Sequence, residues 1–297
     1  MIISASDAGQ RYDLAVAYRI YPEVSRPAQS LPFGDDKLKQ AGICLRSFHS
    51  ALGSLRAKIR VILDGCPKEY RLLFEDLFPA RDLVFVDLNR SGNKATYAKQ
   101  IEVLLAQDDA EYVYLAEDDY FYLPDQFALM LDFLSDRQDV DFVTPYDHPD
   151  CYTAELHRGP KSVTVFKGHH WRTAASTCLT FLTRKRTLAK YERVFKTYLR
   201  RNEDCAIWLS LTKWRVFNPL AAFRYYRRRE IYRKSLLKAW FFCWRQILFG
   251  DSVKLWVPVP GVATHLSAGL LSPCRDWLTL MHQMENSQGT LQSGSLR

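Results

Sequence analysis

The sequence predicts an α/β fold with a central mixed, mostly parallel sheet flanked by helices. Two observations support this prediction. Over the first 140 residues, short apolar stretches of strand length alternate four times with helical patterns, and this alternation is typical of a parallel sheet with helices on both faces. With 297 residues, 47% of them hydrophobic, the chain is also long enough to bury one large core.

Strands and helices follow one another regularly in this first part. The stretch DLAVAYR at residues 13–19 is mostly apolar and predicts the first strand, and the prolines at positions 22, 27 and 32 mark a loop after it. Further strands are expected at residues 59–63, 83–87 and 112–116. Apolar residues at helical spacing predict helices at residues 38–55, 69–78, 91–105 and 124–135.

The pattern changes after residue 140. Strands are expected at residues 140–144, 162–167 and 174–183, and helices at residues 187–200 and 206–211. Residues 219–250 are rich in basic and aromatic side chains and are expected to be helical. The Ser-, Gly- and Gln-rich tail at residues 286–297 is expected to be disordered.

Cysteine usage and charge restrict the class of protein. The seven cysteines are widely spaced and include no Cys-x-x-Cys pair, so we expect reduced thiols in a cytoplasmic protein and no zinc site. The N-terminus shows no signal-peptide pattern, and no apolar run reaches the ~18 residues of a membrane span. The net charge of +8 favours an anionic partner, which is a nucleic acid, an anionic lipid or a phosphorylated substrate.

Three consecutive carboxylates, Glu117-Asp118-Asp119, follow the expected strand at residues 112–116. Adjacent like charges raise one another's pKa unless a cation lies among them, and a divalent cation with oxygen ligands is a natural partner. A solvated acidic turn is the commoner fate of such a triplet. Its position at the carboxyl end of a strand favours a ligand site, because ligands bind at that edge of open α/β sheets.

A second acidic pair, Glu203-Asp204, precedes the expected helix at residues 206–211. Asn202 is a suitable cap for this helix and would place both carboxylates in its first turn. Acidic residues are routine in that position, because the positive helix end stabilises them. The pair therefore has a structural explanation as well as a catalytic one.

In the order of these motifs, residues 12–272 resemble the GT-A glycosyltransferases, especially the inverting, family-two-like enzymes. The resemblance implies that Glu117-Asp118-Asp119 is a variant of the DxD motif, which holds Mn²⁺ or Mg²⁺ against the diphosphate of a nucleotide-sugar donor. Asp119 would be the metal ligand, and Glu117 or Asp118 would face the donor. Glu117 replaces the first Asp of the standard motif, which leaves its contact with the donor open.

The same resemblance implies roles in the second half of the chain. Asp204 would deprotonate the acceptor hydroxyl and Glu203 would orient the acceptor, because the inverting enzymes carry an x-Glu-Asp motif there. His265 would bind the metal or the diphosphate, although a lone histidine is more often structural. His148 would line the sugar pocket. Trp171 would stack on a sugar ring, or it would belong to the core.

Four residues near the strand ends complete the expected donor site. Arg19, Asp64, Gly92 and Asn93 end or follow the first three expected strands, at the sheet edge that carries the acidic triplet. By the resemblance, Arg19 would bind the nucleotide and Asp64 the base, and Gly92 would let the backbone approach the ribose. Each of them is equally well explained as an ordinary turn residue. The absence of a Gly-x-Gly-x-x-Gly or Walker sequence disfavours dinucleotide and P-loop chemistry.

The resemblance implies a catalytic domain at residues 1–218 and a segment at residues 251–285 that returns to the active site. Between them, residues 224–244 interleave basic and aromatic side chains. This mixture suits an amphipathic helix at an anionic membrane surface, and it suits equally a face packed on the domain. A nucleic-acid surface is less favoured, because no nucleic-acid motif accompanies the segment.

These features together predict a cytoplasmic, metal-dependent, inverting glycosyltransferase, peripheral at the inner membrane face if the basic segment binds lipid. It would transfer a sugar from a nucleotide-sugar donor to a hydroxyl of a glycan or a lipid-linked glycan. Two alternatives stay open. A metal-dependent nucleotidyltransferase shares the sheet and the acidic cluster, but normally has a Gly-rich, basic loop after the first strand. A non-catalytic membrane- or RNA-binding protein would use only the basic, aromatic segment.

Overall fold

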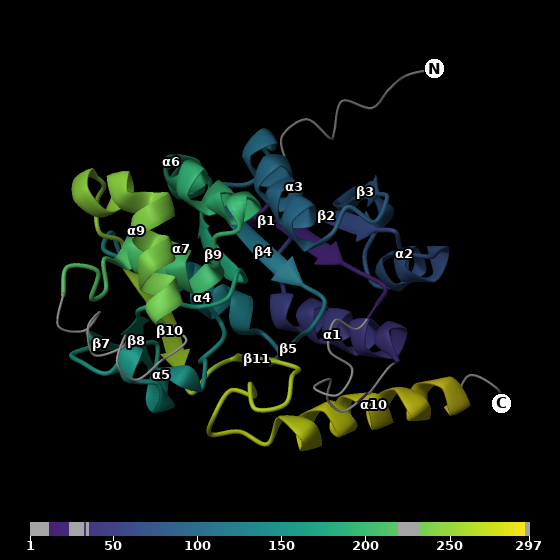
Figure 1. Ribbon diagram of the computed structural model, residues 1–297. Helices are drawn as coiled ribbons and strands as arrows, with labels where there is room; N and C mark the ends of the chain where they lie inside the picture. The colour runs from purple at the N-terminus through teal and green to yellow at the C-terminus, as the bar shows by residue number, and fades with distance from the viewer. Residues whose placement is uncertain (1–11, 24–32, 34–35, 219–231, 295–297) are drawn as a thin grey trace.

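Regular strand–helix units form the N-terminal half of the computed structural model (Figure 1). The structure describes residues 12–23, 33, 36–218 and 232–294. Up to residue 135 its elements are β1 (Leu14–Ile20), α1 (Lys37–Leu52), β2 (Ala57–Asp64), α2 (Lys68–Glu75), the 3₁₀ turn η2 (Ala80–Asp82), β3 (Leu83–Leu88), α3 (Asn93–Ala106), β4 (Tyr112–Glu117), β5 (Tyr120–Tyr122) and α4 (Gln126–Ser135).

Shorter strands and irregular connections follow. The elements are β6 (Phe142–Val143), α5 (Asp150–Thr153), η3 (Glu155–His157), β7 (Val163–Phe166), β8 (His169–Ala174), β9 (Phe181–Arg184), α6 (Lys185–Phe195), η4 (Lys196–Arg200), α7 (Asp204–Thr212), α9 (Tyr232–Phe249), β10 (Leu255–Val259), β11 (Ala263–His265) and α10 (Trp277–Gly294).

Within the described ranges, nine strands form one sheet in the order β3-β2-β1-β4-β9-β6-β10-β8-β7. Strands β8 and β9 run antiparallel to both of their neighbours, so the other seven share one direction. The prediction of a mixed, mostly parallel central sheet is therefore confirmed. The chain passes from β1 to β2 and β3 on one side, then returns to β4 on the other side of β1. Such a reversal of strand order creates a crevice at the carboxyl ends of the two strands.

Helices cover both faces of this sheet (Figure 1). Every residue of β1 is buried, as expected for a strand between two layers of helices. Alternate β1 residues, such as Val16 and Tyr18, pack in one core cluster with α1, α2 and α4. Ala15 and Ala17 face the opposite cluster, to which α3, α6 and α7 contribute. The period of two along the strand thus divides its side chains between two cores.

The strand expected at residues 174–183 is the clearest local error. The chain leaves β8 at Ala174 and enters β9 only at Phe181. Between them, polar side chains bond inside the protein rather than in a ladder: Thr177 Oγ1 lies 3.1 Å from Thr144 Oγ1. Thr144 Oγ1 also donates to the Thr180 carbonyl at 3.2 Å. Because Ser and Thr hydroxyls compete with backbone pairing, they favour an irregular segment here.

Two helices near the C-terminus differ from the expectation or extend it. The kinked α9 packs on α7. The tail expected to be disordered from residue 286 instead continues α10 to Gly294. Asp276 accepts from the Thr279 N–H at 3.1 Å, and Trp277 and Met281 are buried against α1. Once such a turn is formed, each further residue adds a backbone hydrogen bond, so polar residues extend the helix. Among the described helices, none combines the length and hydropathy needed to cross a bilayer.

Candidate active site

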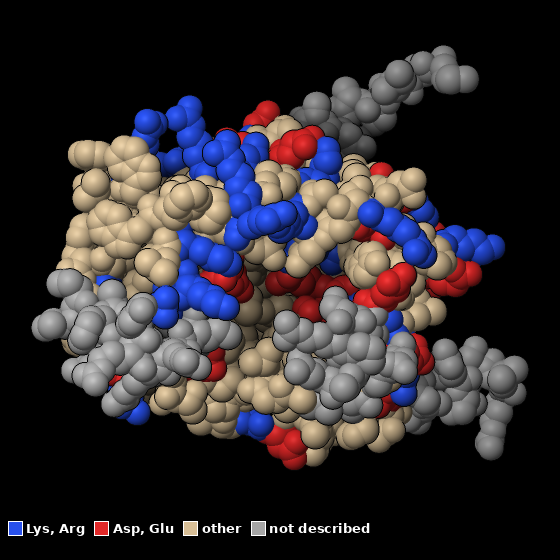
Figure 2. Space-filling view, viewed as in Figure 1, with Lys and Arg blue, Asp and Glu red and all other residues tan. Residues whose placement is uncertain are grey.

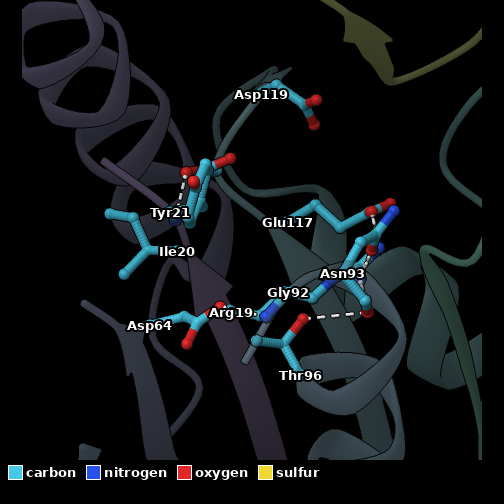
Figure 3. Close-up of a pocket in the computed structure, with 10 residues that line it drawn as sticks. Arg19, Ile20, Tyr21, Asp64, Gly92, Asn93, Thr96, Glu117 and Asp119 are labelled. Atoms are coloured by element: carbon cyan, nitrogen blue, oxygen red, sulfur yellow. Dashed lines mark hydrogen bonds and ion pairs between the residues drawn. The ribbon is translucent and has the colours of Figure 1, made fainter. Parts of the chain in front are cut away.

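A cavity of about 320 Å³ lies where β1 and β4 end; we call it the first cavity (Figure 3). Segments far apart in the sequence build it, because the parallel strands all end at this edge. The residues that line it are Arg19, Ile20, Tyr21, Asp64, Gly92, Asn93, Thr96, Glu117, Asp118 and Asp119. Figure 2 shows Asp and Glu side chains gathered in a hollow near the end of β4, with Lys and Arg side chains around it.

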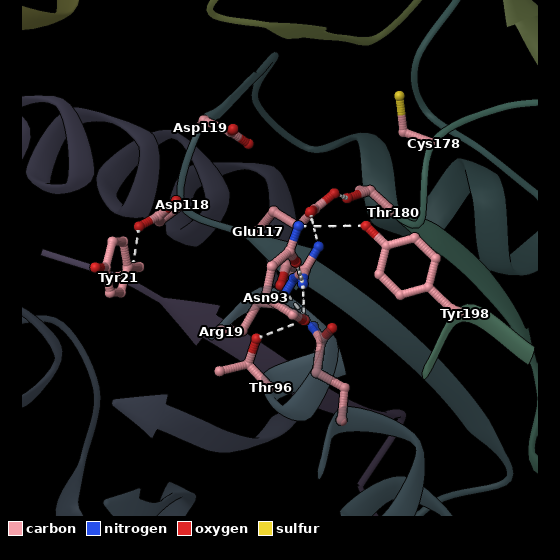
Figure 4. A network of polar contacts seen from close by, with 12 residues as sticks. Arg19, Tyr21, Asn93, Thr96, Glu117, Asp118, Asp119, Cys178, Thr180 and Tyr198 are labelled. Carbon is pink, nitrogen blue, oxygen red and sulfur yellow. Dashed lines mark hydrogen bonds and ion pairs between the residues drawn. The ribbon is translucent and has the colours of Figure 1, made fainter. Parts of the chain in front are cut away.

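Glu117, the first carboxylate of the triplet, lies in a dense polar network (Figure 4). Arg19 forms an ion pair with one Glu117 oxygen, and the Thr180 hydroxyl donates to the other at 2.7 Å. The same guanidinium donates to the backbone carbonyl of Asn93 at 3.1 Å. The amide of Asn93 in turn donates to the hydroxyl of Tyr198 at 3.3 Å. This network ties the ends of β1 and β4 to the start of α3.

Asp118, the second carboxylate, is buried and faces the start of α1. It accepts from the backbone N–H of Tyr21 at 3.0 Å and pairs with the ammonium of Lys37 at 2.9 Å. Burial raises the pKa of Asp118 despite the opposing charge of Lys37. Burial also disfavours the Lys37 ammonium, yet Asp118 and Asp119 outweigh it and raise the pKa of Lys37. Asp118 therefore has a clear structural role in holding the triplet against α1.

Asp119, the third carboxylate, meets His265 from a distant part of the chain. The antiparallel pairing of β5 with β11 places the imidazole Nε2 3.1 Å from Asp119 Oδ2. Burial acts to raise the pKa of Asp119, but His265, Lys37 and Arg19 outweigh it, so this carboxyl stays ionised. Asp119 also raises the pKa of His265 against the effect of burial.

The pair of Asp119 and His265 fits a divalent cation. Asp119 Oδ1 and His265 Nδ1 are buried atoms without a hydrogen-bond partner among the described residues. Carboxylate oxygen is a ligand that suits Mg²⁺ and Mn²⁺, and imidazole nitrogen is a common ligand of divalent transition metals. Over the same residues, no group of three or more His, Cys, Asp or Glu side chains could hold a metal by itself. A cation here would therefore need ligands from a substrate, as Mg²⁺ sites commonly take them from phosphates.

The loop between β3 and α3 is held by Asp64. Its two oxygens accept from the backbone N–H groups of Ser91 at 2.6 Å and of Gly92 at 2.7 Å. Gly92 has φ of +84°, a conformation that L side chains rarely adopt, and it is followed directly by α3. Asp64, expected to bind a base, is thus an anchor of the loop that also lines the first cavity.

A second cavity, of about 430 Å³, lies beside α7. Asp204, the first residue of α7, lines it together with residues of the 174–181 segment, of α5 and η3, and of α9. The full lining is His148, Asp150, His157, Ser176, Thr177, Cys178, Glu203, Asp204, Cys205 and Ser235. The resemblance implies that Asp119 and Asp204 act in one reaction, but the two residues line different cavities.

The two cavities are nevertheless electrostatically coupled. The charge of Glu117, in the first cavity, contributes to raising the pKa of Asp204 in the second. Cys178 lines the second cavity, and burial raises the pKa of its thiol. The charges of Asp204, Glu117 and Asp119 add to this shift. The ring of Tyr146 stands 5.1 Å from that of His148 and 6.4 Å from that of His265. The second cavity thus adjoins the Asp119–His265 pair.

Asp204 is the only acid of α7, and its environment favours the protonated form. Burial raises its pKa to about 6, and Glu117 and Glu203 add to the shift, although its own oxygen accepts from the Cys205 N–H at 2.7 Å. A carboxyl with a pKa near neutrality can take up and release a proton at physiological pH. Asp204 therefore has the property of a general base.

Glu203 lies at the start of α7 and lines the second cavity. It is the N-cap residue of α7, and the expected cap Asn202 instead accepts from the Glu203 N–H at 2.9 Å. The carboxylate of Glu203 accepts from the hydroxyl of Ser235 and from Lys238 at 2.6 Å, both on α9. The prediction of Asn202 as the cap is wrong, because its amide is drawn to Thr197 at 2.8 Å. Glu203 ties α9 to α7 at the edge of the second cavity.

Two further candidates are placed differently from each other. Trp171 is completely buried, with its ring stacked on Phe133 at 3.9 Å and 4°. The prediction that it stacks on a sugar ring is therefore wrong, because the core covers both the ring and its access. His148 lines the second cavity, and its Nδ1 accepts from the Asp150 N–H at 3.0 Å. Burial lowers the pKa of His148, so it is neutral at physiological pH.

Sequence reasoning missed Lys37, Thr180 and Tyr198, which complete the first cavity's polar network. Lys37 had a signal, because it begins the helix after the first strand and so lies at the edge that carries the triplet. Thr180 and Tyr198 had none, since each reaches Glu117 or Asn93 across more than 60 positions of the chain.

Comparison with known proteins found no matching family model and no matching curated sequence. Among solved structures, the galactosyltransferase LgtC, in complex with donor and acceptor sugar analogues, is similar over 77% of this chain and 70% of its own, with 14% identity and a TM-score of 0.37. S. aureus TarS in complex with UDP is similar over 67% of this chain and 54% of its own, with 15% identity and a TM-score of 0.41. The mannosyltransferase PcManGT from Pyrobaculum calidifontis, in complex with GDP-Man and Mn²⁺, is similar over 49% of this chain and 39% of its own, with 17% identity and a TM-score of 0.34. Identities and TM-scores this low carry no argument about function, so the function is inferred from the chemistry of the site.

Proposed function

We propose that this chain is a metal-dependent glycosyltransferase of the GT-A type. It transfers a sugar from a nucleotide-sugar donor to a hydroxyl group of a glycan acceptor. The observation that carries this proposal is the pair of adjoining cavities with carboxylates of opposite character. One holds the ionised Asp119 beside His265, and the other holds Asp204 with a pKa of about 6.

The first cavity suits the nucleoside diphosphate part of a donor. It lies at the crevice where the strand order reverses, which is where α/β sheets bind nucleotides. Gly92 precedes the first turn of α3, where free N–H groups and the positive helix end favour an anion. We assign Asp64, Gly92 and Asn93 to the nucleoside side of the donor, with Arg19 holding Asn93 and Glu117 in place.

Asp119 and His265 would hold Mn²⁺ or Mg²⁺ together with the oxygens of the donor diphosphate. Bound there, the cation would act as a Lewis acid that stabilises the negative charge of the departing diphosphate. Asp118 would keep Asp119 in position through its contacts with Lys37 and Tyr21.

Asp204 supplies the proton chemistry on the acceptor side. Its carboxylate takes the proton of the acceptor hydroxyl while the hydroxyl oxygen attacks the anomeric carbon of the donor sugar. The bond between that carbon and the diphosphate oxygen breaks, and the electron pair leaves with the nucleoside diphosphate. Direct displacement by a positioned acceptor inverts the configuration at the anomeric carbon. Glu203, held by Lys238, lines the acceptor side of the same cavity.

Product analysis tests this proposal. The purified chain is screened for thermal stabilisation by nucleotide sugars with and without Mn²⁺, because a tight ligand raises the apparent stability by mass action. The donor that stabilises it is then incubated with the enzyme, and the products are separated. We expect a nucleoside diphosphate and a transferred or hydrolysed sugar, formed only with the cation. Release of pyrophosphate would instead identify a nucleotidyltransferase, and no stabilisation by any nucleotide sugar would contradict the proposal.

A further inference from the structure

Helix α9 has one face inside the protein and one outside. Leu236, Ala239 and Ile247 are buried in a cluster with Ala206 and Leu209 of α7. This packing fixes the rotation of α9 about its axis. It also determines which side chains are left on the opposite face.

Large apolar side chains occupy that opposite face. The exposed members are Leu237, Phe241, Trp244, Leu248 and Phe249, which we call the apolar stripe. The first four follow one another at three or four residues and the fifth comes directly after them, and the two most exposed are Phe241 at 78% and Phe249 at 79%. Single exposed apolar residues are ordinary, but five on one helix, on both sides of its kink at Cys243, mark an interaction surface.

The charge of α9 indicates which kind of partner binds the apolar stripe. Helix α9 carries four basic residues and, in its sequence, no acidic one. Lys234 and Arg245 are exposed. The eight residues before α9, at positions 224–231, add four arginines and one glutamate to the sequence. Figure 2 shows Lys and Arg side chains bordering a largely uncharged surface over α9.

We propose that the apolar stripe docks the protein on the surface of an anionic lipid bilayer. A helix with aromatic and leucine side chains on one face and basic residues along it lies in the interface of such a membrane. The basic residues gain from the negative surface potential of anionic lipids, while the apolar side chains enter the boundary with the acyl chains. The surplus of positive charge favours an anionic bilayer over an apolar protein partner, because the negative surface potential of the bilayer attracts basic residues close to it.

Docking through α9 would bring a membrane close to the second cavity. Ser235 of α9 lines this cavity and donates to Glu203, and Lys238 bonds the same carboxylate. In this step, which rests on the proposed function, the acceptor is a lipid-linked glycan presented from the bilayer. The bilayer contact itself does not depend on the reaction.

Vesicle co-sedimentation of the full chain tests the bilayer contact. We expect the protein to sediment with vesicles of phosphatidylcholine and phosphatidylglycerol, and far less with phosphatidylcholine alone. The double variant Phe241→Ser/Phe249→Ser is expected to lower the partition coefficient by about tenfold or more, since it removes apolar burial in the interface. Charge reversal at Lys234 and Arg245 to Glu is expected to abolish the preference for anionic vesicles.

Matched substitutions control for folding and for unspecific effects. Leu248 in the apolar stripe and Leu72 on α2 are each 48% exposed, so Leu248→Ser should weaken sedimentation and Leu72→Ser should not. Lys68→Glu on α2 is the matched control for Lys234→Glu. Asp204→Asn should bind vesicles like the unaltered protein even where it fails to transfer sugar, which separates this proposal from the function. Equal sedimentation with neutral and anionic vesicles would overturn it, as would a dimer in solution that Phe241→Ser dissociates.

Discussion

The two cavities use the same residue type in opposite electrostatic environments. In the first, Glu117, Asp118 and Asp119 each have a basic partner, which is Arg19, Lys37 or His265. In the second, burial raises the pKa of Asp204, and the charges of two acids, Glu117 and Glu203, add to this shift. Asp119 has its pKa lowered and Asp204 has its pKa raised to about 6.

In the proposed function, this difference separates two chemical tasks. An acid whose pKa is lowered stays charged and can hold a cation whatever the reaction does to the local proton balance. An acid whose pKa lies near neutrality can accept a proton and release it again. Two carboxyl groups with pKa values pushed apart by their surroundings therefore indicate which is the electrostatic group and which the base.

Replacement of Asp119 should have the largest effect. Asp119→Ala removes the carboxylate oxygens that face the cation, so we expect donor turnover to fall by about 10³-fold. The measurement is release of nucleoside diphosphate at saturating Mn²⁺. Asp251→Ala, which removes an exposed acid paired with Lys190, is the matched control and should keep full activity. Turnover close to that of the unaltered enzyme in Asp119→Ala would end the assignment of the first cavity.

Replacement of Asp204 should follow. Asp204→Asn keeps the shape of the side chain but cannot take up the proton, so we expect sugar transfer to fall by about 10²- to 10⁴-fold. Thermal stabilisation by the donor should persist, because the donor occupies the first cavity. Loss of donor binding in this variant would contradict the assignment of the donor to the first cavity and of Asp204 to the acceptor side.

The pH dependence sharpens the same contrast. Because Asp204 must be ionised to act, kcat/KM should fall as the pH drops through about 6. Glu117 and Glu203 act on this carboxyl, and His148 and His157 line the same cavity. Burial lowers the pKa of His157 to about 4, so His157 does not account for a limb at pH 6. Burial also lowers the pKa of His148, and the variant His148→Ala separates this residue from Asp204. We expect His148→Ala to keep the limb, and a limb that disappears in this variant would reassign it to His148.

The sequence was most informative about the edge of the sheet and least about what meets there. The alternation of apolar strands with helices predicted the ligand-binding edge of the sheet, because parallel strands and short connections leave few alternative arrangements. Lys37 pairs with Asp118 across 81 positions, and His265 reaches Asp119 across 146. Such pairs depend on the rotation of α1 and on the pairing of β11 with β5, which no local pattern specifies. The raised pKa of Asp204 likewise comes from burial by other segments.

A contrast in stability is expected between Lys37 and Lys39, both in the first turn of α1. Lys37 and Asp118 are both buried, so Lys37→Met leaves an unpaired buried charge and should cost about 3 kcal/mol of unfolding free energy. The Lys39 side chain is more than half exposed and pairs with Glu285. Lys39→Met should cost less than about 1 kcal/mol, because exposed ion pairs contribute little. Urea unfolding at neutral pH measures both, and equal losses would contradict a structural role of Lys37.

The smallest effect is expected at Gly92. There is space for a side chain at this position, but its backbone conformation is one that L residues rarely adopt. A Cβ added there would meet no atom within 4 Å, yet φ is +84°. Gly92→Ala should therefore cost about 1 kcal/mol through backbone strain alone. If the strain is relieved by moving the loop away from Asp64, the KM for the donor should rise while kcat stays near its original value. Gly42→Ala in α1 should be neutral or stabilising, because the added methyl meets the flexible tip of Arg46 at 3.3 Å and makes an ordinary contact with Leu73 at 3.6 Å. An unchanged donor KM in Gly92→Ala, together with the expected loss of stability, would exclude the loop from the donor site. The assignment of the first cavity to the donor would then rest on the carboxylates at positions 117–119.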